Sequence, residues 1–166
     1  MQGMENDAVV KIVDQWRRER PDLDTDPMFV VGRMFRLVGA WDRRLRGPFA
    51  EAGLGNGDFD VLAALRRAGE PYALSAGELS RTVLVTTGAI TKRVDRLEAS
   101  GWVTRSVDED DSRGRRITLT AAGVRLTDKL MEAHLENQRM LIETLGPAER
   151  HALAGLLAKL TAAAED

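Results

Sequence analysis

The chain of 166 residues contains no cysteine and two histidines, and 5% of its residues are aromatic. The absence of cysteine excludes disulfide bonds, a thiolate nucleophile, thiol-based peroxide sensing and most structural zinc sites. His134 and His151 are far apart and have no neighbours with ligand-like spacing, so we expect both on helix surfaces and expect no metal or cofactor. Since no nucleophile–base pair or glycine-rich phosphate loop is visible either, the sequence does not predict an enzyme.

The chain also lacks a long apolar run and a strong net charge. No run approaches the ~20 apolar residues that span a bilayer, and the N-terminus is polar and acidic rather than a signal peptide, so we expect a cytoplasmic protein without membrane contact. The net charge of −2 excludes a uniformly basic nucleic-acid binder. Between positions 81 and 116, however, eight basic residues outnumber six acidic ones, and such a local excess suits a groove-binding face.

The most informative pattern lies between positions 74 and 120. Ser75 followed by Glu78 forms a capping box, which predicts a short helix over 75–82. An apolar turn then leads to a second predicted helix over 87–100. Two short helices joined by a tight turn are typical of a helix-turn-helix.

The period of the pattern changes after Gly101, the residue type usual just past a helix end. Alternate positions then share one side of a first strand (Val103, Arg105 and Val107) and of a returning strand (Ile117 and Leu119). The segment between the strands is charged and contains a glycine. A helix-turn-helix followed by a β-hairpin is a winged helix, so we expect a mainly α fold with a small hairpin over residues 57–120.

The helix over 87–100 has two different faces at about 100° per residue. Ile90, Val94 and Leu97 share an apolar face. The opposite face consists of Gly88, Thr91, Lys92 and Asp95. Such a face enters a major groove about 12 Å wide without steric conflict, and the helix N-terminus favours phosphate. The alternative is an ordinary amphipathic surface helix.

Further helices flank this core in what we expect to be a single domain, 1–166. The predicted ranges are 8–20, 26–53 with a kink or stop at Gly47-Pro48, 57–68 capped by Asn56, 121–145 and 147–164. Their apolar stripes exceed what so small a core covers. We therefore predict a homodimer through the helices in 26–53 and 121–164, with 8–20 as a further candidate for the interface, and a pseudo-palindromic target in double-stranded DNA. The alternative is an elongated monomer.

The residues at 86–91 and 94–98 resemble the MarR family of bacterial transcription regulators. The wing at 108–114 and its exit, Leu119-Thr120 followed by Gly123, resemble the same family, although Glu109 stands where the common wing has proline. The resemblance covers nearly the whole chain. It implies a winged-helix dimer that usually represses its own gene and a neighbouring one.

The resemblance also implies roles for individual residues. Arg113 would enter the minor groove, held by Asp111, in accord with the negative potential of narrow A·T-rich grooves; its alternative is a solvated loop charge. Further DNA contacts would come from the turn, the second helix and nearby basic residues: Arg81, Thr86, Thr87, Gly88, Thr91, Lys92 and Arg115. For Arg81 and Arg115, a solvent-facing role is the alternative.

The N-terminal residues at 15–23, followed by Gly32-Arg33, resemble the urate-responsive PecS/HucR branch of that family. The ligand and allosteric residues of that branch match Trp16, Asp60, Arg93 and Arg105. A flat purine anion would stack on Trp16, pair with Arg105 and weaken an ion pair between Asp60 and Arg93. This would shift the helix over 87–100, the recognition helix that enters the major groove.

Each of these four residues also has an ordinary structural interpretation. In this interpretation, Trp16 only anchors its helix and Asp60 is an acidic residue in the first turn of a helix, where the helix dipole favours it. Arg93 and Arg105 then contact DNA phosphates. Xanthine, or a different aromatic or organic acid, fits the same charges as urate. A third hypothesis is an interaction module whose winged helix no longer binds DNA.

Overall fold

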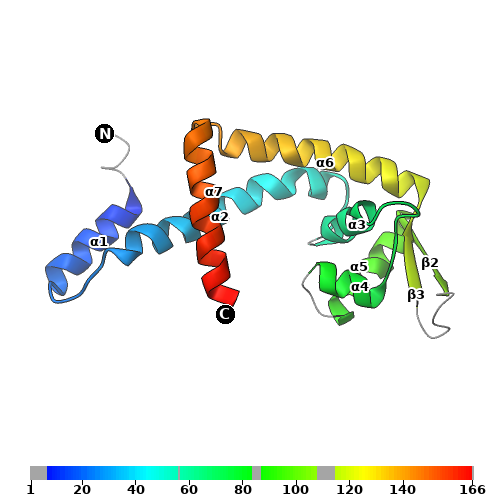
Figure 1. Cartoon of the computed structure of the whole chain (residues 1–166), viewed down its shortest axis with the longest axis horizontal. Coiled ribbons are helices and arrows are strands. Elements are labelled where there is room, and N and C mark those ends of the chain that lie inside the picture. The colour runs from blue at the N-terminus through cyan, green and yellow to red at the C-terminus, as the bar shows by residue number, and fades with distance from the viewer. Residues whose placement is uncertain (1–6, 56, 84–86, 108–114, 166) are drawn as a thin grey trace. The chain divides into compact units, whose positions relative to one another are not determined.

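The computed structural model describes residues 7–55, 57–83, 87–107 and 115–165. The chain divides into two units, Met1–Arg46 and Gly47–Asp166. In chain order, its elements are α1 (Ala8–Glu19), α2 (Pro27–Glu51), α3 (Asp58–Arg67), β1 (Ala73–Ser75), α4 (Ala76–Thr82), α5 (Thr87–Ala99), β2 (Val103–Val107), β3 (Arg115–Leu119), α6 (Ala121–Leu141) and α7 (Pro147–Glu165) (Figure 1). The mainly helical winged helix-turn-helix is confirmed. No helix within the described ranges is long and apolar enough to cross a membrane.

In the first unit, α1 is fixed to α2 by both apolar and charged contacts. The side chain of Asp7 accepts the Val9 N–H at 2.9 Å and caps α1, and it also accepts Arg33 Nε at 2.8 Å. These hydrogen bonds hold the pKa of Asp7 below its usual value. Val9 and Val13 are buried, and a Cβ at Gly32 would lie 3.3 Å from a Val9 methyl group. A small residue at position 32 therefore allows the close approach.

The predicted kink or stop at Gly47-Pro48 does not end α2, which continues through Pro48 to Glu51. Proline removes one N–H donor from a helix, but the last turn has compensating contacts. The Phe49 ring stacks on Phe59 with 4.2 Å between centroids, and the Leu54 N–H donates to the Phe49 carbonyl at 2.9 Å. Packing therefore outweighs the local break, and the helix continues past Pro48.

The second unit is built around α3, where Val61, Leu62 and Leu65 are fully buried. α3 begins at Asp58, one residue later than predicted, and Gly57 occupies the N-cap position with φ +77°. The expected cap, Asn56, lies outside the described residues. Figure 1 shows α3, α4 and α5 gathered beside β2 and β3, and their buried side chains form one apolar cluster.

The sheet has three strands in the order β1-β3-β2, all antiparallel. The hairpin of β2 and β3 confirms the prediction, with Val103 opposite Leu119 and Arg105 opposite Ile117. The sequence did not predict β1, which pairs with the other edge of β3 and places Leu74 opposite Ile117. The capping box confirms the predicted start of α4 directly after β1, because both of its hydrogen bonds are present.

α6 starts where the sequence predicts and ends earlier. Thr120 caps it by accepting the Gly123 N–H at 2.9 Å. The helix ends at Leu141 instead of 145, because Arg150 of α7 reaches back to its end. Arg150 Nε donates to the carbonyls of Ile142 at 3.1 Å and Leu145 at 2.8 Å, which satisfies acceptors that a helix end leaves open.

Candidate nucleic-acid interface and ligand pockets

α5 presents the polar face that the sequence predicts. Ile90, Val94 and Leu97 are at most 1% exposed. Burying aliphatic side chains of this size stabilises the packing of a helix by about 1.5–3 kcal/mol each. Thr91 and Lys92 are exposed on the same helix, so the core holds α5 while its polar face remains open to a ligand of the size of a duplex.

Gly88 adds room on this face near the start of α5. It is exposed, and a Cβ built there would meet nothing within 4 Å. Gly88 is therefore not needed to relieve a contact inside the protein, which agrees with its expected place against DNA. Thr86, Asp111 and Arg113 lie outside the described residues, as does the side chain of Thr87, so their DNA contacts remain predictions.

The two other predicted DNA contacts lie on neighbouring elements. Arg81 is exposed in the last turn of α4, and Arg115 is the exposed first residue of β3. Both positions are accessible to a phosphate, and the structure adds no contact that assigns either of them to DNA.

Arg105 joins the wing to the recognition helix. Its Nη2 donates to Asp95 Oδ1 at 2.5 Å and to the Thr91 carbonyl at 3.4 Å, and its Nη1 donates to Glu98 Oε2 at 3.0 Å. The backbone N–H of Arg105 also donates to Glu98, at 3.1 Å. One guanidinium on β2 therefore pairs with two carboxylates of α5 and fixes the wing strand against the helix.

A pocket of about 290 Å³ lies beside this guanidinium. Its lining combines apolar side chains with a hydroxyl and two cations: Ala76, Ile90, Val94, Ile117, Thr91, Arg105 and Arg115. Such a lining suits a small anion with an apolar body, because the apolar side chains bury the body and the arginines pair with the charge.

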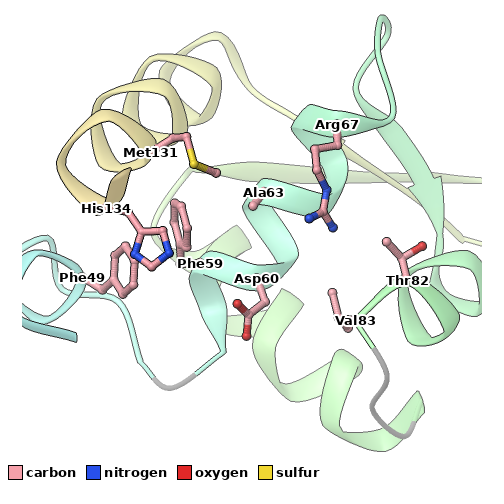
Figure 2. Close-up of a pocket in the computed structure, with 9 residues that line it drawn as sticks. All are labelled: Phe49, Phe59, Asp60, Ala63, Arg67, Thr82, Val83, Met131 and His134. Carbon is pink, nitrogen blue, oxygen red and sulfur yellow. The ribbon is translucent and has the colours of Figure 1, made fainter. Parts of the chain in front are cut away.

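Asp60 lines a different pocket of about 330 Å³, shown in Figure 2. Asp60 and Arg67 point into it from the same side of α3, seven residues apart. The Phe49 and Phe59 rings lie at one end, and His134 of α6 packs against both, 5.3 and 5.7 Å between centroids. His134 is thus half-buried among aromatic rings rather than a plain surface residue.

Arg93 does not pair with Asp60 within the described part of the chain. Its guanidinium instead lies over Gly57, where a Cβ would come within 2.2 Å of Arg93 Cζ, and its Nη1 is buried without a hydrogen-bond partner. The ion pair between α3 and α5 is formed by Asp58 and Arg96, with 2.6 Å between Asp58 Oδ1 and Arg96 Nη2. The described ion pair between α3 and α5 thus joins residues other than the expected Asp60 and Arg93.

Sequence reasoning missed the pair of Asp58 and Arg96. One available signal is an acid at the first position of a helix, directly after the glycines at 53, 55 and 57. A second signal is the arginine three residues beyond Arg93, one helical turn further along the same side of α5.

Trp16 belongs to the first unit and is 47% exposed on α1. Asp60, Arg93 and Arg105 belong to the second unit, where they occupy three separate surroundings. The combination of all four residues into one ligand site therefore remains a prediction. Among the residues with a described position, no group of three or more acidic or histidine side chains could hold a metal ion.

A winged helix with an anchored second helix and an open polar face defines a helix-turn-helix protein of the transcription-regulator class. Comparison with known proteins identifies the family. A model described as "MarR family" matches residues 52–114. The HTH-type transcriptional regulator PecS of Dickeya dadantii is 40% identical over 152 residues, which cover 92% of each chain. The chain therefore belongs to the MarR family of transcriptional regulators.

Solved structures agree with this assignment. A mutant of Escherichia coli MarR complexed with operator DNA is 25% identical and has a TM-score of 0.69, with 87% of this chain and 96% of that chain covered. The structure of Bordetella bronchiseptica BpsR, whose DNA binding is regulated by 6-hydroxynicotinic acid, is 25% identical and has a TM-score of 0.69. The match covers 80% of this chain and 92% of that chain.

Proposed function

We propose that this chain binds a pseudo-palindromic operator in double-stranded DNA as a homodimer, represses transcription there, and is released by a small anionic ligand such as urate or a related purine. The observation that carries the proposal is the exposed face of α5, with Gly88, Thr91 and Lys92 above a fully buried Ile90 and Val94. An operator complex of a related MarR protein supports this use of the fold.

Unburied apolar side chains support the dimer. Every described side chain of α7 except that of Arg150 is exposed, including Leu156 at 60% and Leu160 at 50%. α2 contains no buried residue within the chain, and Phe35 is 77% exposed. Exposed apolar surface of this extent marks an interface, and a two-fold dimer would present two copies of α5 to half-sites about 34 Å apart.

The ligand proposal rests on the pocket beside Arg105. An anion entering it competes with Asp95 and Glu98 for the guanidinium. Ligand binding therefore weakens the ion pairs that join Arg105 of β2 to α5. A ligand that binds two states unequally shifts their populations. Because both carboxylates and Thr91 belong to α5, the change is made directly on the DNA-facing helix. BpsR, whose described regulator is an aromatic acid, supports a flat anionic ligand.

The proposal is tested by fluorescence anisotropy with a labelled duplex from upstream of the gene, titrated with urate, xanthine and 6-hydroxynicotinic acid. We expect salt-dependent binding of a palindrome and release by one of the three compounds at submillimolar concentration. No binding to upstream or genomic fragments would refute the regulator, and binding that none of the compounds disturbs would refute the purine and aromatic-acid ligand.

A substitution separates the ligand response from DNA binding. Trp16→Ala is expected to retain most of the operator affinity and to blunt release by the ligand, as the family resemblance implies. If operator affinity and the ligand response fall together, Trp16 only anchors α1.

A further inference from the structure

We infer that Asp58 and Arg96 are positioning residues that set where the recognition helix lies, and that Arg96 does not contact the DNA backbone. The inference rests on the DNA binding proposed above. Arg96 is one of three basic residues on α5, and its side chain is half exposed, so charge alone would assign it to a phosphate. The geometry turns it towards α3 instead.

Asp58 provides a buried receptor for this arginine at the first residue of α3. The carboxylate is 3% exposed. It accepts Arg96 Nη2 at 2.6 Å on Oδ1, and on Oδ2 it accepts Arg96 Nε at 3.2 Å and the Gly55 N–H at 2.8 Å. The hydrogen bonds to Asp58 raise the pKa of Arg96. A two-point fork between planar groups fixes direction as well as distance, which a single contact would not.

Two glycines allow both arginines of α5 to reach this segment. A Cβ at Gly57 would lie 2.2 Å from Arg93 Cζ, and one at Gly55 would lie 3.0 Å from Asp58 Oδ2 and 3.4 Å from Arg96 Nε. A side chain at position 57 would therefore displace the Arg93 guanidinium, and one at position 55 would crowd the Asp58 carboxylate that accepts Arg96. Arg93 and Arg96, one turn apart, thus attach α5 to the loop before α3 at two places.

This attachment determines the DNA-facing surface because α3 is the most buried element of its unit. Thr91 and Lys92 are exposed on the recognition helix that the Asp58–Arg96 pair anchors. If the pair is broken, a buried carboxylate loses its cation, and α5 can shift or fray at its C-terminal half while the core around Leu62 stays packed. Contacts to the duplex would then be lost without loss of any residue that touches it.

The chain offers a matched control in Arg66, which makes a similar fork to Asp128 between α3 and α6, at 2.8 and 3.3 Å. This pair does not involve α5. Operator affinity would be measured at several salt concentrations for the wild type, Arg96→Gln, Asp58→Asn, the double variant and Arg66→Gln. We expect each single α3–α5 variant to lose about 2- to 30-fold in affinity, the double variant to lose no more, and Arg66→Gln to match the wild type.

The salt dependence distinguishes positioning from a phosphate contact. Removing a phosphate contact lowers the slope of log K against log salt by about 0.9, so we expect an unchanged slope in Arg96→Gln. A lowered slope, together with normal affinity in Asp58→Asn, would make Arg96 a phosphate contact and overturn the inference. Normal affinity in both variants would overturn it as well. Arg96→Lys, which retains the charge but lacks the planar two-point fork, should recover part of the affinity.

Amide hydrogen exchange tests the same inference without DNA. Arg96→Gln and Asp58→Asn should increase exchange in α5 and leave α3 near Leu62 protected, whereas Arg66→Gln should not change α5. Unchanged exchange in α5 would overturn the positioning role. If the wild type binds no DNA while α5 responds as expected, the proposed function fails and the role of the pair in placing α5 stands.

Discussion

Gly123, near the start of α6, permits a close backbone approach that a single methyl group should disrupt. A Cβ at this position would lie 2.0 Å from the Trp102 carbonyl oxygen and 3.0 Å from its carbon. The approach is held by Thr120, whose N–H donates to the same oxygen at 3.1 Å and whose hydroxyl accepts the Gly123 N–H. Gly123→Ala should therefore separate the start of α6 from the start of β2.

The size of the effect follows from two opposing contributions. Alanine is favoured over glycine in a helix by about 1 kcal/mol. Overpacking usually costs about 1–3 kcal/mol. The upper end applies here because the clashing carbonyl oxygen and carbon of Trp102 are backbone atoms and cannot rotate away. The net expectation is a loss of about 2 kcal/mol in the free energy of unfolding. With a urea m-value of about 2 kcal/mol/M, the midpoint should fall by about 1 M.

The matched control is Gly77→Ala in α4, where a Cβ would meet nothing within 4 Å. This variant should be as stable as the wild type or slightly more stable. The wild type and the two variants are compared by urea unfolding followed by circular dichroism. All three are measured at one protein concentration, because the stability of a dimer depends on concentration. Equal midpoints for the two variants would refute the steric argument.

Three further predictions concern DNA, the dimer and pH. Arg113→Ala should weaken operator binding by about 1–3 kcal/mol in an anisotropy titration, and unchanged affinity at two salt concentrations would refute the wing contact. Leu156→Glu should give a monomer in light scattering and abolish operator binding, whereas Lys159→Gln on the same helix should remain dimeric. The Ser75 N–H lowers the pKa of Glu78, so the carboxylate stabilises α4 fully above its usual value near 4.5 and loses this effect as pH falls through the lowered folded-state pKa. Glu78→Gln should remove that acid-dependent part of the wild-type unfolding curve, and identical pH dependence in both proteins would contradict it.

Elements with strong local signals could be predicted from the sequence. The capping box of Ser75 and Glu78 and the apolar repeat of Ile90, Val94 and Leu97 specify helices and faces through neighbouring residues alone. In contrast, β1 spans three residues, too few for a period to appear. Its existence depends on pairing with β3, more than forty residues later.

Features that depend on distant partners were misjudged for the same physical reason. Pro48 is tolerated because Phe49 stacks on Phe59, and α6 ends early because Arg150 satisfies carbonyls at its end. The candidate site shows this most clearly. The sequence identified an acid of α3 and an arginine of α5 as partners, but side-chain direction selects Asp58 and Arg96 rather than the residues two and three positions away.

The charges around α5 explain how a small anion could release DNA without a large movement. In the present state, one guanidinium on β2 pairs with both Asp95 and Glu98. In the proposed function, an anion that takes over Arg105 leaves these two carboxylates without their cation on the helix proposed to face the phosphate backbone. The resulting repulsion opposes DNA binding directly, and salt weakens it because Asp95 is more than half exposed. The Asp58–Arg96 pair on α3 does not share this guanidinium, so α5 would remain attached to the core while its affinity for DNA falls.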